Sequence, residues 1–532
     1  MAEGNTSLIT GWRQGLNWKN FFTCTSLAMA LLSWGYFAGI IATTATKTSF
    51  LRYMDLIDED GNNTPGSAEK LGAMSSIFQG GGILGVIVFG LMADHIGRKW
   101  SVIICAGLGV ISQAILAGSV NITMFLTLRF FVGASGYGFM PVLSAYIAEL
   151  APAAMRGLYV GMCGATCALG FALSSYMGVA FWSTNDAVQW RVPLGLGAII
   201  PLILGILYLW FPESPRFRLM QGRREEALAI VMSQHGQHGH ADFARAEFFQ
   251  MEKQAQMDME QDASWSLFLF KASVRRRCII TCALAMFAQS TGNLVVQNFG
   301  QQILTSLGYG VYQQLCFQAG WITVSPVFNI IGSFAADYFG RRPLLMTGLG
   351  LCMTWLSIHT AMVATYAGDG TNAAGLSVAV AMFFLFNASY ALAGDVSVFI
   401  IVGEIFPNHL RGRGATIAFI STTLTNLIYL QAAPTGLRNI GWKFFLLFIA
   451  ITFCGILYVY FFVPETKGIA LEELAEIFGE DVAVHARDIH VDHNKVQLDQ
   501  EAADGSITTE VVVDSVKEEK GAMHTENVAA VP

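Results

Sequence analysis

The sequence predicts an all-α membrane protein, with twelve transmembrane helices in two pseudo-symmetric six-helix bundles. The chain has 532 residues, of which 54% are hydrophobic and only 13% are charged, whereas soluble domains carry about 25% charged residues. Long apolar runs follow one another along the chain, and three polar motifs occur twice, about 250 residues apart. These observations exclude a soluble globule, and two like halves in a membrane are typical of a transporter.

Each expected span is an apolar run of roughly 20 residues or more, which is long enough to cross the hydrocarbon core of a bilayer. The first run lacks the form of a cleavable signal, so we expect it to remain as a helix. The twelve spans are 21–45, 71–93, 100–120, 123–147, 158–182, 190–211, 278–300, 313–336, 343–366, 374–402, 414–435 and 441–463.

These spans divide the chain into five parts. Residues 1–20 form a cytoplasmic N-terminus, 21–216 and 276–479 form the two bundles, and 217–275 form a cytoplasmic linker with surface helices. In the last part the apolar pattern stops and acidic residues outnumber basic ones. We therefore expect 480–532 to be a disordered acidic cytoplasmic tail.

Several classes of site and function are not expected. His235, His238 and His240 in the linker have no cysteine or carboxylate at ligand spacing, and the nine cysteines lie mostly in apolar runs, where they behave as small hydrophobic residues. We therefore predict neither a metal nor another cofactor. The net charge of -7 gives no reason to expect nucleic-acid binding. Because no set of nucleophile and base is visible, we do not expect an enzyme.

Basic residues in the short loops predict the orientation, because such residues remain on the cytoplasmic side. Both termini are then cytoplasmic, and the acidic loop around Asp55 and Asp58 lies outside. This orientation makes Asn62, in Asn62-Asn63-Thr64, a glycosylation candidate. The basic residues are Arg98, Lys99, Arg156, Arg216, Arg218, Arg223, Arg224, Arg275, Arg276, Arg277, Arg341, Arg342, Arg411 and Arg413.

Three motifs repeat between the halves, each at the end of an apolar run. A compact charged turn in such a place is expected at a membrane face, where the hydrocarbon ends. The pairs are Gly90–Lys99 with Gly332–Arg342, Glu149–Gly157 with Glu404–Gly412, and Pro212–Arg216 with Pro464–Gly468.

These motifs carry a resemblance to a known family. The turn at Gly90–Lys99 resembles the signature of the major facilitator superfamily. Arg129-x3-Gly133 and the other motif pairs resemble the sugar porter family within it, and Gln289–Asn293 is similar to its fungal lactose-permease-like and hexose-transporter branch. Together the motifs cover the chain from about residue 20 to 478. The resemblance implies the major facilitator fold, in which two bundles rock about a central substrate site.

Charged residues of these motifs are candidates for an inner gate. Glu149 and Arg156 lie seven residues apart at the inner ends of helices four and five, with Pro152 breaking the helix between them. A desolvated Glu–Arg pair can hold the bundles together there and release them when water enters. Alternatively, these charged residues only fix the orientation of the chain in the membrane. The resemblance favours a gate formed by Asp94, Arg98, Glu149, Arg156, Asp337, Arg341, Glu404 and Arg411.

The centre of the chain departs from the family pattern. The resemblance implies Gly-Tyr-Asp in helix one of a proton-driven sugar porter. This chain has Gly35-Tyr36-Phe37 there, so the titratable carboxylate is missing. The family's helix-five Gln falls on Gly164. Arg129 remains in helix four without its usual partner. We expect Arg129 to face the cavity or, alternatively, to extend to the outer interface.

Other polar residues replace the missing sugar-binding groups. Asp395 precedes Glu404 by nine residues, which places it about 13 Å from the inner end of helix ten, near the midplane. An ionisable group at that depth indicates function, with a helix-bonding role as the alternative. The predicted substrate-binding residues are Gln289, Asn293, Gln297, Asn298, Ser325, Asp395, Phe399 and Arg129.

The sequence therefore predicts a monomeric carrier that moves a small polar solute by alternating access across a lipid bilayer, expected to be the plasma membrane. The leading substrate is a sugar or polyol. One alternative is an organic acid or sugar-like metabolite that meets Arg129, and another is a nutrient sensor on a transporter scaffold, which the short tail disfavours. The absence of a helix-one carboxylate favours a facilitator over a proton symporter, unless Asp395 carries the proton.

Overall fold

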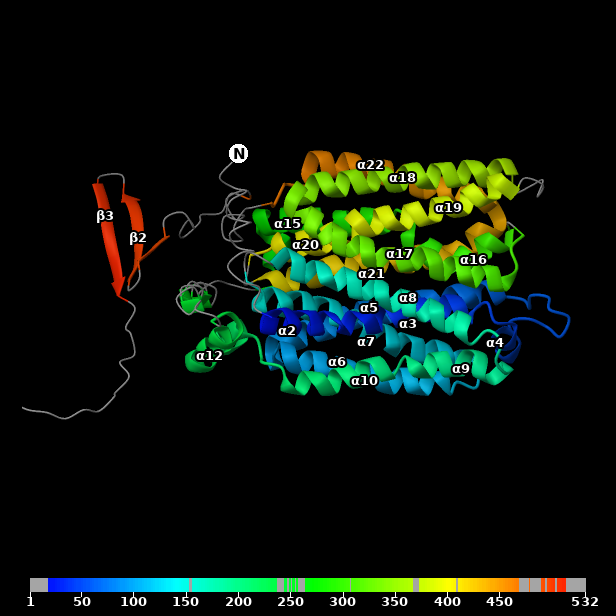
Figure 1. Ribbon diagram of the computed structural model, residues 1–532, viewed down its shortest axis with the longest axis horizontal. Coiled ribbons are helices and arrows are strands. Elements are labelled where there is room, and N and C mark those ends of the chain that lie inside the picture. The colour runs from blue at the N-terminus through cyan, green and yellow to red at the C-terminus, as the bar shows by residue number, and fades with distance from the viewer. Residues whose placement is uncertain are drawn as a thin grey trace, which may run out of the picture. The chain divides into compact units, whose positions relative to one another are not determined.

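Membrane-length helices dominate the computed structural model of the protein (Figure 1). Within the described residues, eleven helical segments are long and apolar enough to cross a membrane. The last of them, Arg411–Phe462, has 52 residues and contains two spans, because the chain turns at Gly441, where φ is 55°. The fold class is the predicted one, with six spans in each half. The structure describes residues 18–152, 156–236, 244–245, 248–249, 251–253, 255–256, 264–306, 308–366, 373–407, 410–467, 478, 489–492, 495–502 and 505–512.

The N-terminal half begins its first span at Trp18, before the expected residue 21. Its fourth span starts at a capped turn, where the Asn121 side chain accepts a hydrogen bond from the Met124 amide at 2.8 Å. Such a cap satisfies one of the free amides of a first helical turn. The helices are α2 (Trp18–Ala28), α3 (Ala30–Thr44), α5 (Ser67–Ile96), α6 (Arg98–Ala117), α7 (Ile122–Leu150), α8 (Arg156–Ala180), α9 (Asp186–Leu196), α10 (Ile199–Leu207) and the 3₁₀ turn η2 (Tyr208–Trp210).

Two spans of the C-terminal half, which we expected to be continuous, are interrupted near their middles. The seventh span breaks at Gly292, where φ is 84°, and the tenth contains a π-helical turn. Breaks of this kind turn backbone and side chains toward a site. The elements are α15 (Ala272–Gln289), α16 (Asn293–Ser306), α17 (Val311–Phe339), α18 (Arg341–Tyr366), α19 (Ala373–Ser389), η3 (Tyr390–Asp395), α20 (Val396–Glu404), α21 (Arg411–Ile440), η5 (Gly441–Lys443) and α22 (Phe444–Phe462).

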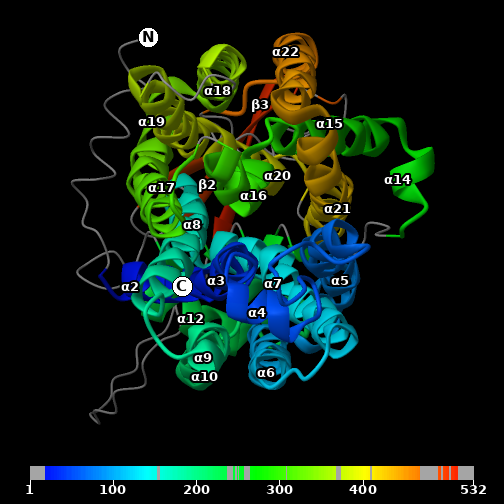
Figure 2. The ribbon, with the colours of Figure 1, turned by 90° about the vertical axis from the view of Figure 1, so that its right-hand side faces the viewer.

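The two halves meet along two pairs of long helices, α5 with α21 and α8 with α17 (Figure 2). Small residues allow this approach: a Cβ atom at Gly161 of α8 would lie 2.2 Å from the Ser333 hydroxyl of α17. Between α5 and α21, the Ser76 hydroxyl donates a hydrogen bond to the Gln431 side chain. Small and hydroxyl-bearing residues are typical of helix contacts in membranes, because lipid tails leave no hydrophobic force to drive the association.

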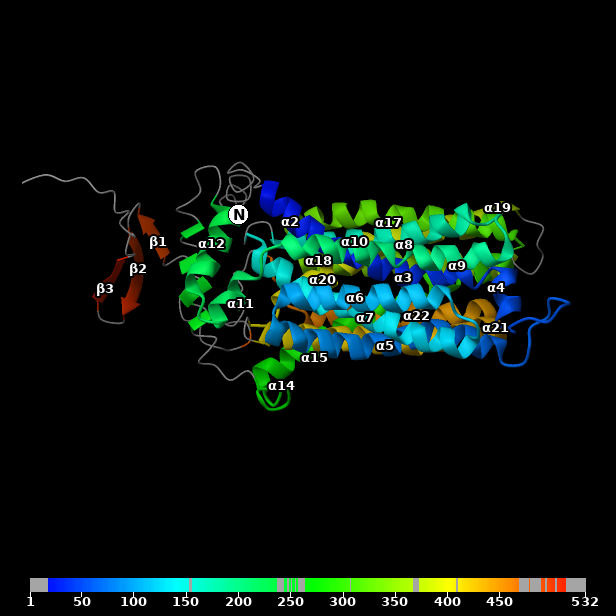
Figure 3. The same ribbon diagram turned by 90° about the horizontal axis from the view of Figure 1, so that it is seen from below.

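The linker helices α11 (Pro215–Met220), α12 (Arg224–His235) and α14 (Leu267–Phe270) lie at one end of the bundles. The short helix α4 (Thr48–Tyr53) lies at the other end (Figures 1 and 3). We call these the linker end and the far end. At the far end, buried Lys47 donates to the Gly178 carbonyl at 2.9 Å and lies 4.7 Å from the Trp182 ring centre. Burial lowers the pKa of Lys47 to about 8.

Helix α12 docks against the end of α7. The ring Nε2 of buried His235 lies 2.9 Å from the Leu150 carbonyl, which also accepts a hydrogen bond from the Asn20 amide at 2.8 Å. His235 therefore packs the linker onto the N-terminal bundle. His238 and His240 lie outside the described residues. Within the described part of the chain, no group of three His, Cys, Asp or Glu residues could hold a metal.

Residues beyond 481 form a separate unit. Its strands β1 (Ile489–Asp492), β2 (Lys495–Ala502) and β3 (Gly505–Val512) pair antiparallel in the order β1-β2-β3. These strands lie within the predicted tail at 480–532. Alternation of apolar and polar residues, as in Val496-Gln497-Leu498-Asp499, is a strand pattern that the acidic composition concealed.

Candidate functional site

A cavity of about 70 Å³ lies between the two halves, near the middle of the helices. Side chains from α3, α7 and α8 line it on one side, and side chains from α15, α16, α17, η3, α20 and α21 line it on the other. The space exceeds the 10–15 Å³ or so that a single water needs. Six of the eight predicted binding residues line it, namely Gln289, Asn293, Gln297, Ser325, Asp395 and Phe399.

The other two predicted residues, Asn298 and Arg129, do not line the cavity. The Asn298 amide donates to the Leu294 carbonyl of its own helix at 2.9 Å. Asn298 lies one residue after Gln297, a rotation of about 100° around the helix. It therefore points elsewhere while Gln297 reaches the cavity.

Arg129 takes neither of the two positions that we expected. Its side chain is 1% exposed, donates to the Phe37 carbonyl at 2.7 Å and to the Met74 carbonyl at 3.3 Å, and packs 4.5 Å from the Phe78 ring centre. Backbone carbonyls thus replace the carboxylate that helix one lacks. Because these carbonyls already hold the guanidinium, it is withdrawn from the cavity.

Asp395 reaches the cavity from the end of the π-helical turn η3. Its carboxylate lies beside the Asn329 amide and the Tyr390 hydroxyl, and the residue remains half-buried. Gly164 faces this group from α8, where a Cβ atom would lie 3.0 Å from Asn329 Oδ1 and 3.9 Å from Asp395 Cβ. The absence of a side chain at Gly164 therefore leaves room for the carboxylate and the amide.

Amide side chains form a chain of contacts that includes the cavity residues Asn293, Gln297 and Ser325. The Gln297 amide lies 3.5 Å from both Asn293 Oδ1 and Asn387 Oδ1, at the long limit of a hydrogen bond. The Asn387 amide in turn donates to Ser325 Oγ at 2.6 Å. Amide groups that are held loosely can exchange these contacts for bonds to solute hydroxyls, since each amide both donates and accepts.

Sequence reasoning missed the aromatic wall on the N-terminal side. Trp34 packs edge-on against Tyr137 at 5.2 Å and against Phe171 at 5.6 Å between ring centres. The Trp34 ring N–H and the Tyr137 hydroxyl are buried and make no hydrogen bond of ordinary geometry with described residues. Within an apolar run, a Trp or Tyr that faces a cavity cannot be distinguished by sequence from one that faces lipid or the core. The spacing of these residues therefore did not predict the aromatic wall.

At the linker end, buried Arg98 joins three helices of the N-terminal half. Its guanidinium lies 3.1 Å from Glu149 and 3.7 Å from Asp94, and also donates to the Ala93 carbonyl at 3.2 Å. Glu149 accepts a further bond from the Ser214 hydroxyl. These partners compensate the charge of the buried guanidinium, although its Nε makes no hydrogen bond of ordinary geometry with described residues.

The C-terminal half repeats this arrangement around Arg341. Its guanidinium lies 3.2 Å from Glu404 and 3.3 Å from the Ala336 carbonyl, and Thr466 donates to Glu404 at 2.8 Å. Each predicted Glu therefore contacts the Arg of the first motif in its own half. The side chains of Arg156 and Asp337 lie outside the described residues.

The third motif pair supplies a glutamate whose role we had not predicted. Glu213 accepts hydrogen bonds from the amides of Arg98 and Lys99, at 3.0 and 3.1 Å, at the start of α6. Glu465 does the same for Arg341 and Arg342, at 3.0 and 3.1 Å, at the start of α18. A carboxylate at a helix N-terminus satisfies free amides and favours the helix dipole.

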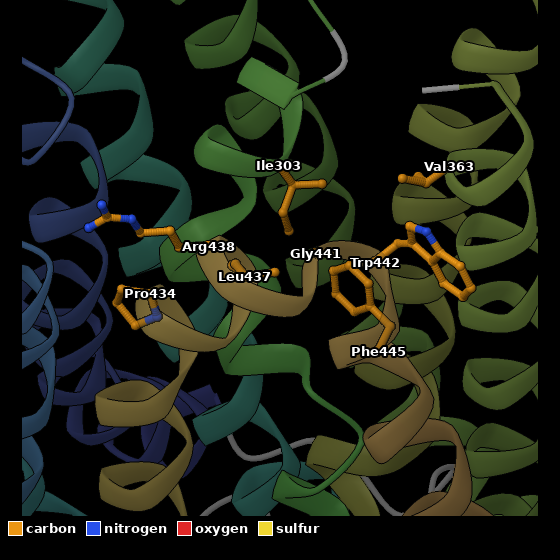
Figure 4. A pocket seen from close by; sticks show the side chains of 8 residues that line it. All are labelled: Ile303, Val363, Pro434, Leu437, Arg438, Gly441, Trp442 and Phe445. Atoms are coloured by element: carbon orange, nitrogen blue, oxygen red, sulfur yellow. The ribbon is translucent and has the colours of Figure 1, made fainter. Parts of the chain in front are cut away.

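A second cavity, of about 220 Å³, lies at the far end of the C-terminal half (Figure 4). Ile303, Val363, Leu437, Trp442 and Phe445 give it mainly apolar walls, and Arg438 extends away from the aromatic rings. Although larger, this cavity lacks the converging polar groups of the central one, so the central cavity is the better candidate site.

Comparisons with known proteins agree with this geometry. Residues 23–478 match the family model described as sugar (and other) transporter. The chain belongs to this sugar transporter family. The sugar porter resemblance is thereby confirmed, and the protein is a multi-pass membrane carrier rather than an enzyme.

Two curated relatives and one solved structure illustrate the likeness. The chain is 26% identical to high-affinity glucose transporter 1 of Candida albicans, over 87% of this chain and 86% of that one. It is 28% identical to the major myo-inositol transporter IolT of Bacillus subtilis, over 84% and 92%. The proton:xylose symporter XylE bound to 6-bromo-6-deoxy-D-glucose has the same fold, with a TM-score of 0.75 at 23% identity, over 87% of this chain and 100% of that one.

Replacing Glu465 by Gln tests the role of the third motif. The variant loses the negative charge opposite the first amides of α18, and we expect a cost of about 1–2 kcal/mol. Thermal unfolding in detergent measures it as a lower midpoint. Glu69→Gln is the matched control, because Glu69 is an exposed glutamate in the first turn of α5. Equal shifts in both variants would refute a special role for Glu465.

Proposed function

We propose that this carrier moves a sugar or polyol by alternating access through the central cavity. The observation that carries the proposal is the pairing of loosely held amides, Gln297 and Asn293, with the polar aromatic groups of Trp34 and Tyr137 in the same lining. Hydroxyl groups of a sugar both donate and accept, so they suit both walls. The relatives named for glucose and myo-inositol support the same substrate class.

An organic acid, our alternative substrate, receives less support. Its carboxylate would need a cation in the cavity, and Arg129 instead donates to backbone carbonyls of Phe37 and Met74. A nutrient sensor on the same scaffold would still bind the solute but would not move it.

Gln289→Ala tests the site. The Gln289 side chain lines the cavity 3.4 Å from the Tyr390 hydroxyl, and we expect its removal to weaken solute binding by about 1–3 kcal/mol. Asn298→Ala is the control, because Asn298 bonds to its own helix and should leave affinity unchanged. Solute affinity of the purified variants checks both. Unchanged affinity in Gln289→Ala would remove this residue from the site.

Energy coupling is part of the proposal, and we favour a facilitator over a proton symporter. A proton-driven carrier needs a group whose protonation is linked to the side that is open, and Phe37 cannot titrate. Arg129, bonded to the Phe37 carbonyl, has no carboxylate among its bonded partners. Asp395 is then the candidate proton carrier if coupling exists.

Uptake into proteoliposomes with an imposed inward proton gradient tests the facilitator. We expect a neutral sugar to equilibrate without exceeding its outside concentration. Accumulation that disappears with a protonophore would contradict this. Further loss of accumulation in Asp395→Asn would place the proton on helix ten.

We propose that the linker end carries the inner gate, with Asp94 as its link between the halves. Asp94 on α5 lies near the first turn of α21, where a Cβ atom at Gly412 would be 3.6 Å from its carboxylate. The N-terminus of a helix favours negative charge. Arg98, at 3.7 Å, holds Asp94 in that place, while the Glu149 and Glu404 pairs stiffen each half.

Asp94→Asn tests the gate. Loss of a favourable interaction worth about 1–2 kcal/mol at the helix terminus should weaken the inner-closed state and slow transport several-fold. Uptake rates in proteoliposomes measure the effect. Asp60→Asn in the exposed loop at the far end is the control and should not change the rate. A normal rate in Asp94→Asn would exclude this residue from the gate.

The orientation and location are also proposals. With the linker end in the cytoplasm, Asn62 lies outside in an exposed turn. The backbone N–H of Asn62 donates a hydrogen bond to the Asp58 side chain at 2.7 Å. We propose a monomer in the plasma membrane that is glycosylated at Asn62. Glycosidase treatment of the protein from a eukaryotic membrane, with Asn62→Gln as control, tests this topology. Unaltered mobility of both would refute glycosylation at Asn62.

A further inference from the structure

The central cavity carries a negative charge that a neutral sugar does not require. Asp395 is the acidic residue of its lining, and no lysine or arginine from the described part of the chain lines the space. Asn329 and Tyr390, which lie beside the carboxylate, are neutral groups. A carboxylate near the middle of a membrane protein is costly unless a cation or several hydrogen bonds compensate it.

Arg129, the cation that we expected at the cavity, binds other groups. The Arg129 guanidinium is buried and donates to the carbonyls of Phe37 and Met74. It is absent from the cavity lining, so it does not compensate Asp395 there. No basic side chain of the lining supplies a compensating positive charge, and a protonated amine of the solute can supply it.

Aromatic rings surround the remainder of the cavity. Trp34, Tyr137 and Phe171 form one cluster, with ring centres 5.2–5.6 Å apart. Phe399 and Phe419 form another, with centres 5.7 Å apart, and both clusters line the same space as Asp395. Aromatic faces attract cations, above all ammonium groups, and this attraction is stronger where water is excluded.

The backbone allows the carboxylate to lie at the cavity wall. Gly164 offers no side chain toward Asn329 and Asp395, and the π-helical turn that ends at Asp395 turns the residue toward the cavity. Asp395 consequently stays half-buried rather than sealed. A small cationic group has access to it from the cavity.

We propose that the preferred solute is a hydroxylated organic cation, an amino sugar or amino polyol, whose protonated amine binds the Asp395 carboxylate within the aromatic walls. Its hydroxyl groups contact the amides of Gln289, Asn293 and Gln297. This inference rests on the proposed function, because it narrows the substrate of the same cavity from sugars and polyols to their amines.

Binding of two matched solute pairs to the purified full-length protein tests the inference: glucose with glucosamine, and sorbitol with glucamine. Each pair differs by an ammonium group in place of a hydroxyl, and buffer at neutral pH keeps most of each amine protonated. We expect the amine to bind about 10-fold more tightly in at least one pair. Equal or weaker binding of both amines would overturn the proposal.

Variants test whether Asp395 causes the preference for the amine. Asp395→Asn should abolish the advantage of the amine over its neutral partner, while Asp395→Glu should retain it. Asp186→Asn, at an exposed residue in the first turn of α9, is the control and should change neither affinity. An amine preference that survives in Asp395→Asn would assign it to another group.

The outcomes separate this inference from the proposed function. Binding and transport of glucose or sorbitol without any amine preference would sink the inference and leave the sugar or polyol carrier standing. Failure of all four solutes to bind would overturn both. The comparison of solutes in the unmodified protein tests the proposal without any variant. The proposal can therefore be overturned even if a variant fails to fold.

Discussion

The structure depends on two buried arginines that must be compensated where they lie. Arg98 and Arg341 each join the charged groups and carbonyls of three helices within their own half. Removing a guanidinium from water costs several kcal/mol unless such partners surround it. Each half is therefore assembled around its own ion at the linker end, and a glutamate that binds helix amides, Glu213 or Glu465, completes the arrangement. Movement then occurs between the halves more easily than within them.

The contact between the halves has a different character. It relies on small residues, such as Gly161 against Ser333, and on isolated polar contacts such as Ser76 with Gln431. Packing of this kind is close, and small side chains let one surface slide past the other. Rigid halves with a weakly polar seam are what alternating access requires.

The charged motifs at the linker end repeat between the halves, whereas the central cavity departs from the family pattern. These departures are linked to one another in the structure. Phe37 replaces the carboxylate expected in helix one, and Arg129 binds the backbone carbonyl of that same residue. Gly164 replaces an amide, and the vacated volume accommodates Asn329 and Asp395. The result is a cavity from which the guanidinium has withdrawn and into which a carboxylate has entered. The cavity thereby has an acidic residue in its lining, whereas a cavity that binds an organic acid would need a cation. Its amides still suit hydroxyl groups.

The sequence by itself determined the number of spans, the division into halves, and the charged groups at the linker end. These follow from local rules, because hydrocarbon imposes length and polarity on every segment and the motifs repeat. Only the tertiary structure decided that Glu149 contacts Arg98, that Asn298 turns to its own helix, and that Trp34 enters the cavity. A helix in a membrane has apolar residues on its lipid face and on its buried face alike. The direction in which each side chain points therefore depends on how helices from both halves pack around it.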